Sequence, residues 1–233
     1  MPFPSKDWFK KTLYHKRYQP RQSYICHMSL VPKVLEDAVD RFAELPGVGR
    51  KTAFRYVLHL LKQEDDKLKS FSRSLDKLIT DAKQCKTCFN VADTDHCSIC
   101  ASHNRDHSVI CVVEDIRDVI LFESTEQFNG TYHVLGGVIS PMDGVGPSDL
   151  NIGPLIDRVN AEEVKEVVMA LNTTMEGDTT NFYLYRMLKD KDIKLTTLAR
   201  GVSSGGGLEY TDELTLGRSL TQRVQYESTL SGL

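Results

Sequence analysis

The four cysteines Cys85, Cys88, Cys97 and Cys100 constrain the fold more than any other feature of the sequence. They form the pattern C-x2-C-x8-C-x2-C, in which each pair directs two thiolates at one point, so that two pairs complete a tetrahedron around Zn²⁺. The chain between the pairs is too short for a hydrophobic core, so a metal must supply most of the local folding free energy. A closed four-thiolate shell leaves no position for water. We therefore predict a structural zinc site, the alternative being four unligated structural cysteines.

The composition is that of an ordinary globular protein, with 40% hydrophobic and 26% charged residues. We find no apolar run that approaches the length of a membrane helix, and therefore predict no membrane association. The net charge is −3, so a polyanion such as DNA must bind at local basic groups. Because no secretory signal is present, we expect a cytoplasmic protein, in which clustered cysteines bind metal in preference to forming disulfides.

The first 27 residues differ from the rest, with six basic residues, one acid, and no helical apolar stripe. Three interpretations of this leader stay open. In the first, translation starts at Met28, where an organised pattern begins. In the second, the leader is a disordered basic arm that contacts DNA. In the third, it is a transit peptide. Its few serines and arginines make the transit peptide the weakest of the three.

Helical periodicity dominates the region before the cysteines. Apolar residues recur at i, i+3, i+4 and i+7, which predicts amphipathic helices. The first should end near Leu45, because Pro46 disfavours helical geometry in the residue before it. The expected helices run from about Val31 to Leu45, from Lys51 to Leu61, and over residues 68–82.

The connector between the first two helices is Leu45-Pro46-Gly47-Val48-Gly49. A G-x-G turn at a helix N-terminus lets backbone N–H groups approach a phosphate, and the helix dipole favours the anion. Lys51 and Arg55 lie at i, i+4 on one helix face, with Arg50 nearby. We interpret this as a sequence-independent phosphate grip. The alternative is an ordinary helical hairpin with solvated basic residues. The residues of the predicted grip are Gly47, Gly49, Arg50, Lys51 and Arg55.

After the cysteines the pattern changes to short β-branched runs that alternate with helices, which predicts an α/β domain with a buried parallel sheet. A Gly- and Pro-rich stretch separates the first two runs, and a Gly-rich loop, residues 201–207, precedes the last helix. The expected strands are Val109–Val113, Val164–Leu171 and Lys194–Ala199, and the expected helices are Thr179–Lys189 and Asp212–Arg223.

Acidic residues follow two of these strands: Glu114 follows the first, and Glu176 and Asp178 follow the second. Ligands of parallel α/β sheets collect at the carboxyl ends of strands, and clustered carboxylates there can hold Mg²⁺. Two alternatives stay open. The acids are ordinary loop and helix-start residues, or they form a docking patch for a basic protein.

Taken in order over about Leu30 to Arg223, these motifs resemble those of the RecR family of recombination mediators. The resemblance implies an α+β chain of several modules. The matching motifs are residues 45–53, the four-cysteine module, residues 110–114, 132–137, 140–147, 176–178 and 208–218. The implied modules are a helix-hairpin-helix (29–84), a four-cysteine zinc finger (85–107), a Toprim-type α/β parallel-sheet domain (108–203), and a C-terminal Gly-loop plus helix for subunit assembly (204–233). Residues 1–28 precede them as an N-terminal extension.

The function implied by the resemblance is that of a DNA-binding mediator of recombinational DNA repair, without enzymatic activity. Members of the family act with RecO, and in some species RecF, to load RecA on gapped or single-stranded DNA. They form ring-like homotetramers thought to act as DNA clamps, and the expected location is the nucleoid in the cytoplasm. Lys51 and Arg55 match the family's DNA-contacting positions. Glu114, Glu176 and Asp178 match the Toprim acidic positions, which serve partner binding more than chemistry.

The sequence departs from the family pattern in three places. Arg50 stands where many relatives have Pro, Ser203-Ser204 replaces a Pro-containing step, and the leader matches nothing. Two other function classes stay open. One is a Mg²⁺-dependent Toprim enzyme, nuclease or primase-like, with an acidic pair of the form Glu176-x-Asp178. The other is an adaptor that ignores nucleic acid and uses zinc only to staple an oligomer.

Overall fold

The computed structural model describes residues 31–202, 205 and 207–223. The basic leader and Ser203-Ser204 lie outside the described residues. The described chain forms two compact units. The first contains three helices and a two-stranded hairpin, and the second contains the four cysteines, a parallel sheet and the chain that follows it. The elements of the first unit are α2 (Lys33–Ala43), α3 (Arg50–Leu61), α4 (Asp65–Thr80), β1 (Lys83–Gln84) and β2 (Val91–Ala92).

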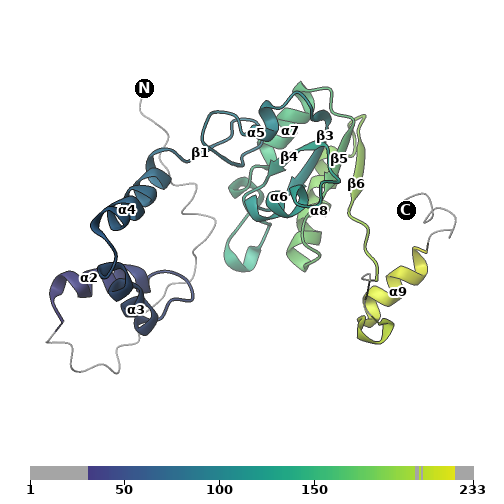
Figure 1. The fold of residues 1–233 in the computed structure, drawn as a ribbon. Coiled ribbons are helices and arrows are strands. Elements are labelled where there is room, and N and C mark those ends of the chain that lie inside the picture. The colour runs from purple at the N-terminus through teal and green to yellow at the C-terminus, as the bar shows by residue number, and fades with distance from the viewer. Residues whose placement is uncertain (1–30, 203–204, 206, 224–233) are drawn as a thin grey trace. The chain divides into compact units, whose positions relative to one another are not determined.

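The predicted helix-hairpin-helix is formed by α2 and α3, which pack together in the first unit (Figure 1). Val39, Ala53 and Val57 are buried between them and form a small core of their own. Gly47 has φ +76° in the connector, a left-handed conformation that glycine adopts without steric cost. The helix α2 runs from Lys33 to Ala43. Its C-terminal end therefore comes two residues before the predicted end at Leu45.

The second unit is built on a four-stranded parallel sheet with the strand order β4-β3-β5-β6. The prediction of a parallel α/β sheet is therefore confirmed. Cys111 of the central strand β3 lies opposite both Tyr132 and Val168, which fixes the register of the neighbouring strands. The strands are β3 (Asp106–Val113), β4 (Gly130–Val134), β5 (Glu166–Met169) and β6 (Lys194–Thr197).

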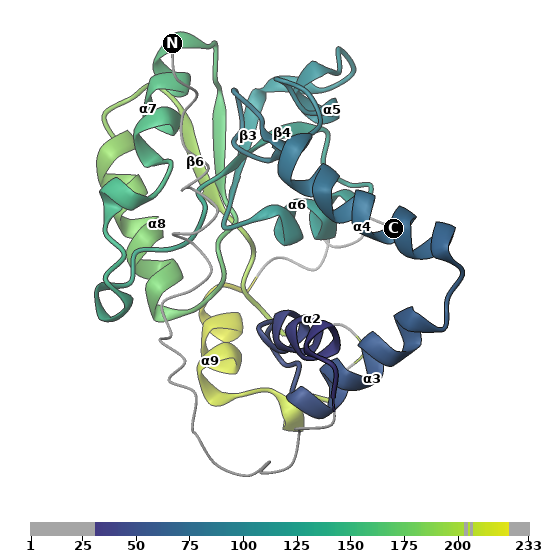
Figure 2. The ribbon, with the colours of Figure 1, turned by 90° about the vertical axis from the view of Figure 1, so that its left-hand side faces the viewer.

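Helices cover both faces of the sheet, and the alternation of side chains along β3 serves both layers. Ile110 and Val112 pack on the face that α7 (Ile152–Ala161) and α8 (Met175–Leu188) cover, with Leu155 and Leu184 among the buried residues. Cys111 and Val113 point to the other face, where α6 (Ile116–Glu123) lies. Figure 2 shows α7 and α8 side by side on one face and α6 on the other.

Besides the short helical turns, the sequence prediction missed one strand and two helices of this unit: β4, α6 and α7. The strand β4 is buried along its whole length yet contains Gly130, Thr131 and His133, so it lacks a β-branched run. The helix α8 begins at Met175, four residues before the predicted Thr179, because Thr174 caps it by accepting a hydrogen bond from the Gly177 N–H at 3.1 Å.

The remaining elements are short or lie toward the C-terminus. The strands β5 and β6 are shorter than the predicted runs, and α9 begins one residue after Asp212, which caps it. The short elements are α5 (Ser98–Ala101), η1 (Pro141–Asp143), η2 (Pro147–Asp149) and η3 (Leu208–Tyr210), and the last helix is α9 (Glu213–Thr221).

Candidate zinc centre and nucleic-acid interface

The four predicted cysteines come together in one cluster. The Sγ atoms of Cys85, Cys88, Cys97 and Cys100 all lie within 4.8 Å of one another. A tetrahedral zinc with Zn–S distances of about 2.3 Å requires sulfur–sulfur distances of roughly 3.8 Å, which this cluster satisfies with small adjustments. The first three cysteines are buried and Cys100 is partly exposed. The donor set and its spacing therefore fit a structural zinc ion.

Local backbone geometry positions these thiols. Phe89 has φ +63°, which reverses the chain after the first pair and lets its N–H donate to the Cys85 carbonyl at 3.0 Å. Cys97 caps α5 and its Sγ accepts from the Cys100 N–H at 3.4 Å, while the Cys97 N–H donates to Cys85 Sγ at 3.3 Å. Backbone donors aimed at sulfur stabilise the thiolate form that a metal requires.

The thiols of the cluster differ in the direction of their pKa shifts. Hydrogen bonds from Cys100 and Cys88 lower the pKa of Cys97, which favours its thiolate form. Hydrogen bonds with Cys100 and Cys97, together with burial, raise the pKa of Cys88. Four thiolates at this spacing repel one another, and a divalent cation removes that repulsion.

The cysteine module is attached to the sheet. The Val134 N–H at the end of β4 donates to the Cys88 carbonyl at 2.8 Å. The ring of Phe89 lies 5.3 Å from that of His133, which is buried and hydrogen-bonded through Nε2 to the Asn151 carbonyl at 2.8 Å. Burial lowers the pKa of His133 to about 4, so this imidazole stays neutral at pH 7. The metal module thus fixes the position of β4 in addition to its own loops.

The predicted phosphate grip lies at the start of α3. Gly49 is the N-cap residue of α3, and Lys51 and Arg55 are exposed on the helix. Arg50 differs from these two cations. Its guanidinium forms ion pairs with Asp40 at 2.7 Å and Glu36 at 3.3 Å, both on α2. Arg50 therefore stabilises the hairpin, and its charge is already balanced.

The three predicted acidic residues lie beyond the carboxyl ends of β3 and β5. Glu114 follows β3 and accepts a hydrogen bond from the side-chain amide of Asn172 at 3.0 Å. Glu176 and Asp178 both lie in the first turn of α8. Asp178 forms an ion pair with Arg200, which lowers the pKa of that carboxyl. Among the described residues, only the four cysteines bring three or more metal-ligating atoms together, so the acids form no such group there.

Two residues of this edge were not anticipated from the sequence. Asn172 and Arg200 each hold one of the predicted acids, across 58 and 22 residues of chain. No local pattern marks such partners, because they are paired by the order of the strands. The only hint is that both follow strands of the sheet, as ligand-binding residues of α/β domains do.

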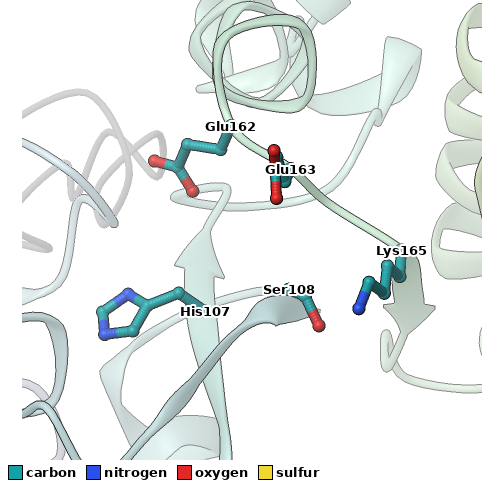
Figure 3. A pocket seen from close by; sticks show the side chains of 5 residues that line it. All are labelled: His107, Ser108, Glu162, Glu163 and Lys165. Carbon is teal, nitrogen blue, oxygen red and sulfur yellow. The ribbon is translucent and has the colours of Figure 1, made fainter.

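A further pocket, of about 460 Å³, lies at the opposite end of the sheet. Figure 3 shows Glu162 and Glu163 across this pocket from His107 and Ser108. His107 and Ser108 lie near the amino end of β3, and Lys165 precedes β5. Ligands of parallel sheets bind at the carboxyl ends, so we assign no role to this pocket.

No helix in the described part of the chain has the length and apolar character needed to cross a lipid bilayer. The fold and the metal site together define a class of protein. It is a helix-hairpin-helix joined to a four-cysteine zinc module and a parallel-sheet Toprim-type domain. Comparison with protein-family models gives the same modules in order along the chain. The matched families are the RecR helix-hairpin-helix (35–79), the RecR four-cysteine zinc finger domain (82–102), the Toprim domain (108–199) and the RecR C-terminal region (201–224).

Curated relatives match nearly their whole length. The recombination protein RecR of Bacteroides thetaiotaomicron is 56% identical over 197 residues, which cover 84% of this chain and 96% of the relative. That of Phocaeicola vulgatus is 57% identical over 196 residues, with coverage of 84% and 96%. That of Flavobacterium johnsoniae is 51% identical over 202 residues, with coverage of 87% and 98%. The chain belongs to the RecR family of recombination proteins, which act in DNA repair.

Proposed function

We propose that this chain is a non-enzymatic DNA-binding mediator that loads RecA on gapped or single-stranded DNA together with RecO, and with RecF where that protein is present. The proposal includes a ring-like homotetramer that acts as a clamp at the nucleoid. One observation supports it above the others. In a chain with a net charge of −3, Lys51 and Arg55 stand on one exposed face of a hairpin helix without an acidic partner among the described residues.

The charge distribution around the hairpin favours a phosphate ligand. The helix α3 contains no Asp or Glu, and its N-terminus adds a partial positive charge. Two carboxylates of the neighbouring helix α2, those of Glu36 and Asp40, form ion pairs with Arg50. Their charges are therefore balanced locally. The positive potential of Lys51 and Arg55 remains for an external polyanion.

The acidic edge supports a docking role more than a chemical one. Asp178 is neutralised by Arg200, and Glu114 is held by an amide donor, so two of the three acids already have protein partners. The remaining carboxylate, Glu176, suits contact with a basic partner protein such as RecO. We therefore keep Mg²⁺ only as a hypothesis to be tested at Glu176.

The module boundaries are part of the proposal. We propose that residues 29–84 bind DNA, that residues 85–107 are held by zinc, and that residues 108–203 dock the partner proteins. Residues 204–233 would then serve subunit assembly, and residues 1–28 would form an extension. The family models, which match 35–79, 82–102, 108–199 and 201–224, support this division.

The DNA-binding proposal is tested by fluorescence anisotropy with duplex and gapped DNA at several salt concentrations. The double variant Lys51→Ala/Arg55→Ala should bind more weakly, and the slope of log affinity against log salt should fall by about 0.9 for each duplex phosphate that the variant no longer binds. The matched control is Arg73→Ala/Lys77→Ala, which removes two cations with the same i, i+4 spacing from α4. Equal binding by both double variants would refute the proposal.

The enzymatic alternative has its own test. Purified protein is incubated with supercoiled DNA and Mg²⁺, with Glu176→Ala as the comparison. We expect no nicking by either protein. Metal-dependent cleavage that disappears in Glu176→Ala would replace the mediator proposal with a Toprim nuclease. An adaptor that ignores DNA would be recognised by the absence of any salt-dependent binding in the unaltered chain.

A further inference from the structure

A shallow groove runs along one face of α3 and has a volume of about 370 Å³. Its lining residues follow one another at i, i+3, i+4, i+7, i+8 and i+11, which is the spacing of a single helix face. They include the two cations of the phosphate grip. The six residues are Lys51, Phe54, Arg55, Leu58, His59 and Lys62.

The groove combines an apolar part with a cationic one. Phe54 is partly buried and packs against the hairpin core, and it lines the groove together with Leu58, which is 37% exposed. Lys51, Arg55 and Lys62 line the same groove as these two apolar residues. A helix face that only contacts water would not need Phe and Leu among its cations. A helix face that only packs on a core would not carry three cations.

The charge of the groove restricts the ligand to an anion. None of the six lining residues is acidic. Among the described residues, Lys51, Arg55 and Lys62 make no ion pair, and the guanidinium of Arg55 lies over the ring of Tyr56, with Cζ at 5.7 Å from the ring centroid. An anion with both charges and apolar faces matches this lining.

Duplex DNA satisfies only half of that description. Its bases are stacked inside the helix, so a duplex offers phosphates to Lys51 and Arg55 and nothing to Phe54 or Leu58. A single strand can turn a base outward, and base–aromatic stacking is tolerant of sequence because every base has a π-face. The Cα atoms of Lys51 and Lys62 are separated by about 16 Å along the helix, enough for a strand to run past the apolar surface.

We propose that this groove binds an unpaired stretch of DNA, with phosphates on Lys51, Arg55 and Lys62 and a base against Phe54 and Leu58. Phe54 and Leu58 then give the hairpin its preference for single-stranded over duplex DNA. This inference rests on the proposed DNA-binding function, and it adds the form of DNA that the hairpin selects and the residues that select it.

The test compares affinities for oligo-dT and for a duplex of equal length at one salt concentration. Phe54→Leu keeps an apolar side chain against the hairpin core but removes the aromatic face. It should weaken oligo-dT binding about fivefold or more, and change duplex binding less than about twofold. Leu58→Ala, at a more exposed position, should act in the same direction with a smaller effect. Phe71→Leu on α4, at a side chain that is 41% exposed, is the matched control.

The outcomes separate this inference from the function on which it rests. Equal losses on oligo-dT and duplex, or no loss on either, would overturn the role of Phe54 and Leu58. If Lys51→Ala/Arg55→Ala still loses binding in that case, the DNA-binding proposal stands without the inference. If that double variant binds both DNAs normally, the proposed function fails first. Unchanged thermal unfolding of Phe54→Leu serves as the check that the hairpin is intact.

Discussion

Arg200 donates two hydrogen bonds to the carboxylate of Asp178, from Nη1 to Oδ2 at 3.3 Å and from Nη2 to Oδ1 at 2.5 Å. The pair joins the first turn of α8 to the segment that follows β6. It neutralises one of the three acidic residues that follow strands of the sheet.

Removing this arginine should raise the pKa of Asp178. In the folded chain, the hydrogen bonds from Arg200 lower that pKa below its ordinary value. The pair therefore contributes stability above about pH 4, which is lost as the pH falls through the folded pKa. Because the pair is partly exposed, Arg200→Ala should cost at most about 1 kcal/mol at pH 7. NMR titration of the Asp178 carboxyl checks the pKa, with the exposed Arg186→Ala as control. An unchanged pKa would contradict the prediction.

Zinc binding should be lost when a cysteine of the cluster is replaced, and should be kept when a buried cysteine outside the cluster is replaced. Cys97→Ser should lower the zinc content below one ion per chain and reduce solubility or assembly, since the closed shell loses one of its four ligands. Cys111→Ser alters a cysteine that is also buried but lies in β3, outside the cluster, and it should keep full zinc. Elemental analysis and size-exclusion chromatography measure both effects. A zinc-free Cys97→Ser of normal oligomeric size would argue against a structural metal.

The close approach at Gly177 should not tolerate a methyl group. A Cβ there would lie 2.0 Å from the Asn172 carbonyl oxygen, so α8 or the loop after β5 must move. We expect Gly177→Ala to destabilise the fold by about 1–3 kcal/mol. Gly217→Ala, in α9, meets nothing within 4 Å and should leave stability unchanged or slightly raised. Urea unfolding of the two variants decides the matter, and equal midpoints would disprove the steric explanation.

A polar network beside the cysteine module should make stability depend on pH. Glu123 accepts hydrogen bonds from Arg105 at 2.9 Å and from the Tyr132 hydroxyl at 2.8 Å, and the arginine lowers the pKa of Glu123. Its contribution is present above about pH 4.3 and is lost as the pH falls through the folded pKa. Glu123→Gln should cost about 1–3 kcal/mol at pH 7.

The measurement for this network is urea unfolding at neutral pH and at a pH of about 3.5, below the ordinary glutamate pKa. The difference between Glu123→Gln and the unaltered chain should begin to shrink at the lower pH, because the carboxyl of the unfolded chain takes up a proton there while Arg105 still lowers the pKa of the folded one. Glu163→Gln, at an exposed glutamate outside this network, should behave as the unaltered chain at both pH values. A constant difference between Glu123→Gln and the unaltered chain would show that the charge of Glu123 does not contribute.

Features with a short sequence period were predictable. The helices α2, α3 and α4 follow from apolar residues at helical spacing, and the zinc cluster follows from two C-x2-C pairs, because a metal needs only ligand type and spacing to close its shell. The central strand β3 was also predictable from a short local pattern, since a run of β-branched residues indicates a strand that is buried on both faces.

Features that depend on burial alone were not predictable. The strand β4 carries Gly130, Thr131 and His133, and only pairing with β3 makes it a strand. The helix α7 begins with Ile152, Gly153 and Pro154, a sequence typical of a turn. It is helical here because Leu155 and Val159 pack into the core against the sheet. In both cases tertiary contacts override weak local preference.

The amino-acid pattern alone was enough to define the modules and the chemistry that each can offer: thiolates for zinc, a cationic hairpin helix, and acids after strands. Which charges remain available was settled by packing. In the packed hairpin, Arg50 forms ion pairs with Glu36 and Asp40, whereas Lys51 lines a groove together with Phe54. Helix spacing and ligand type are local properties of the chain, whereas an ion pair depends on a distance that exists only after the helices have packed.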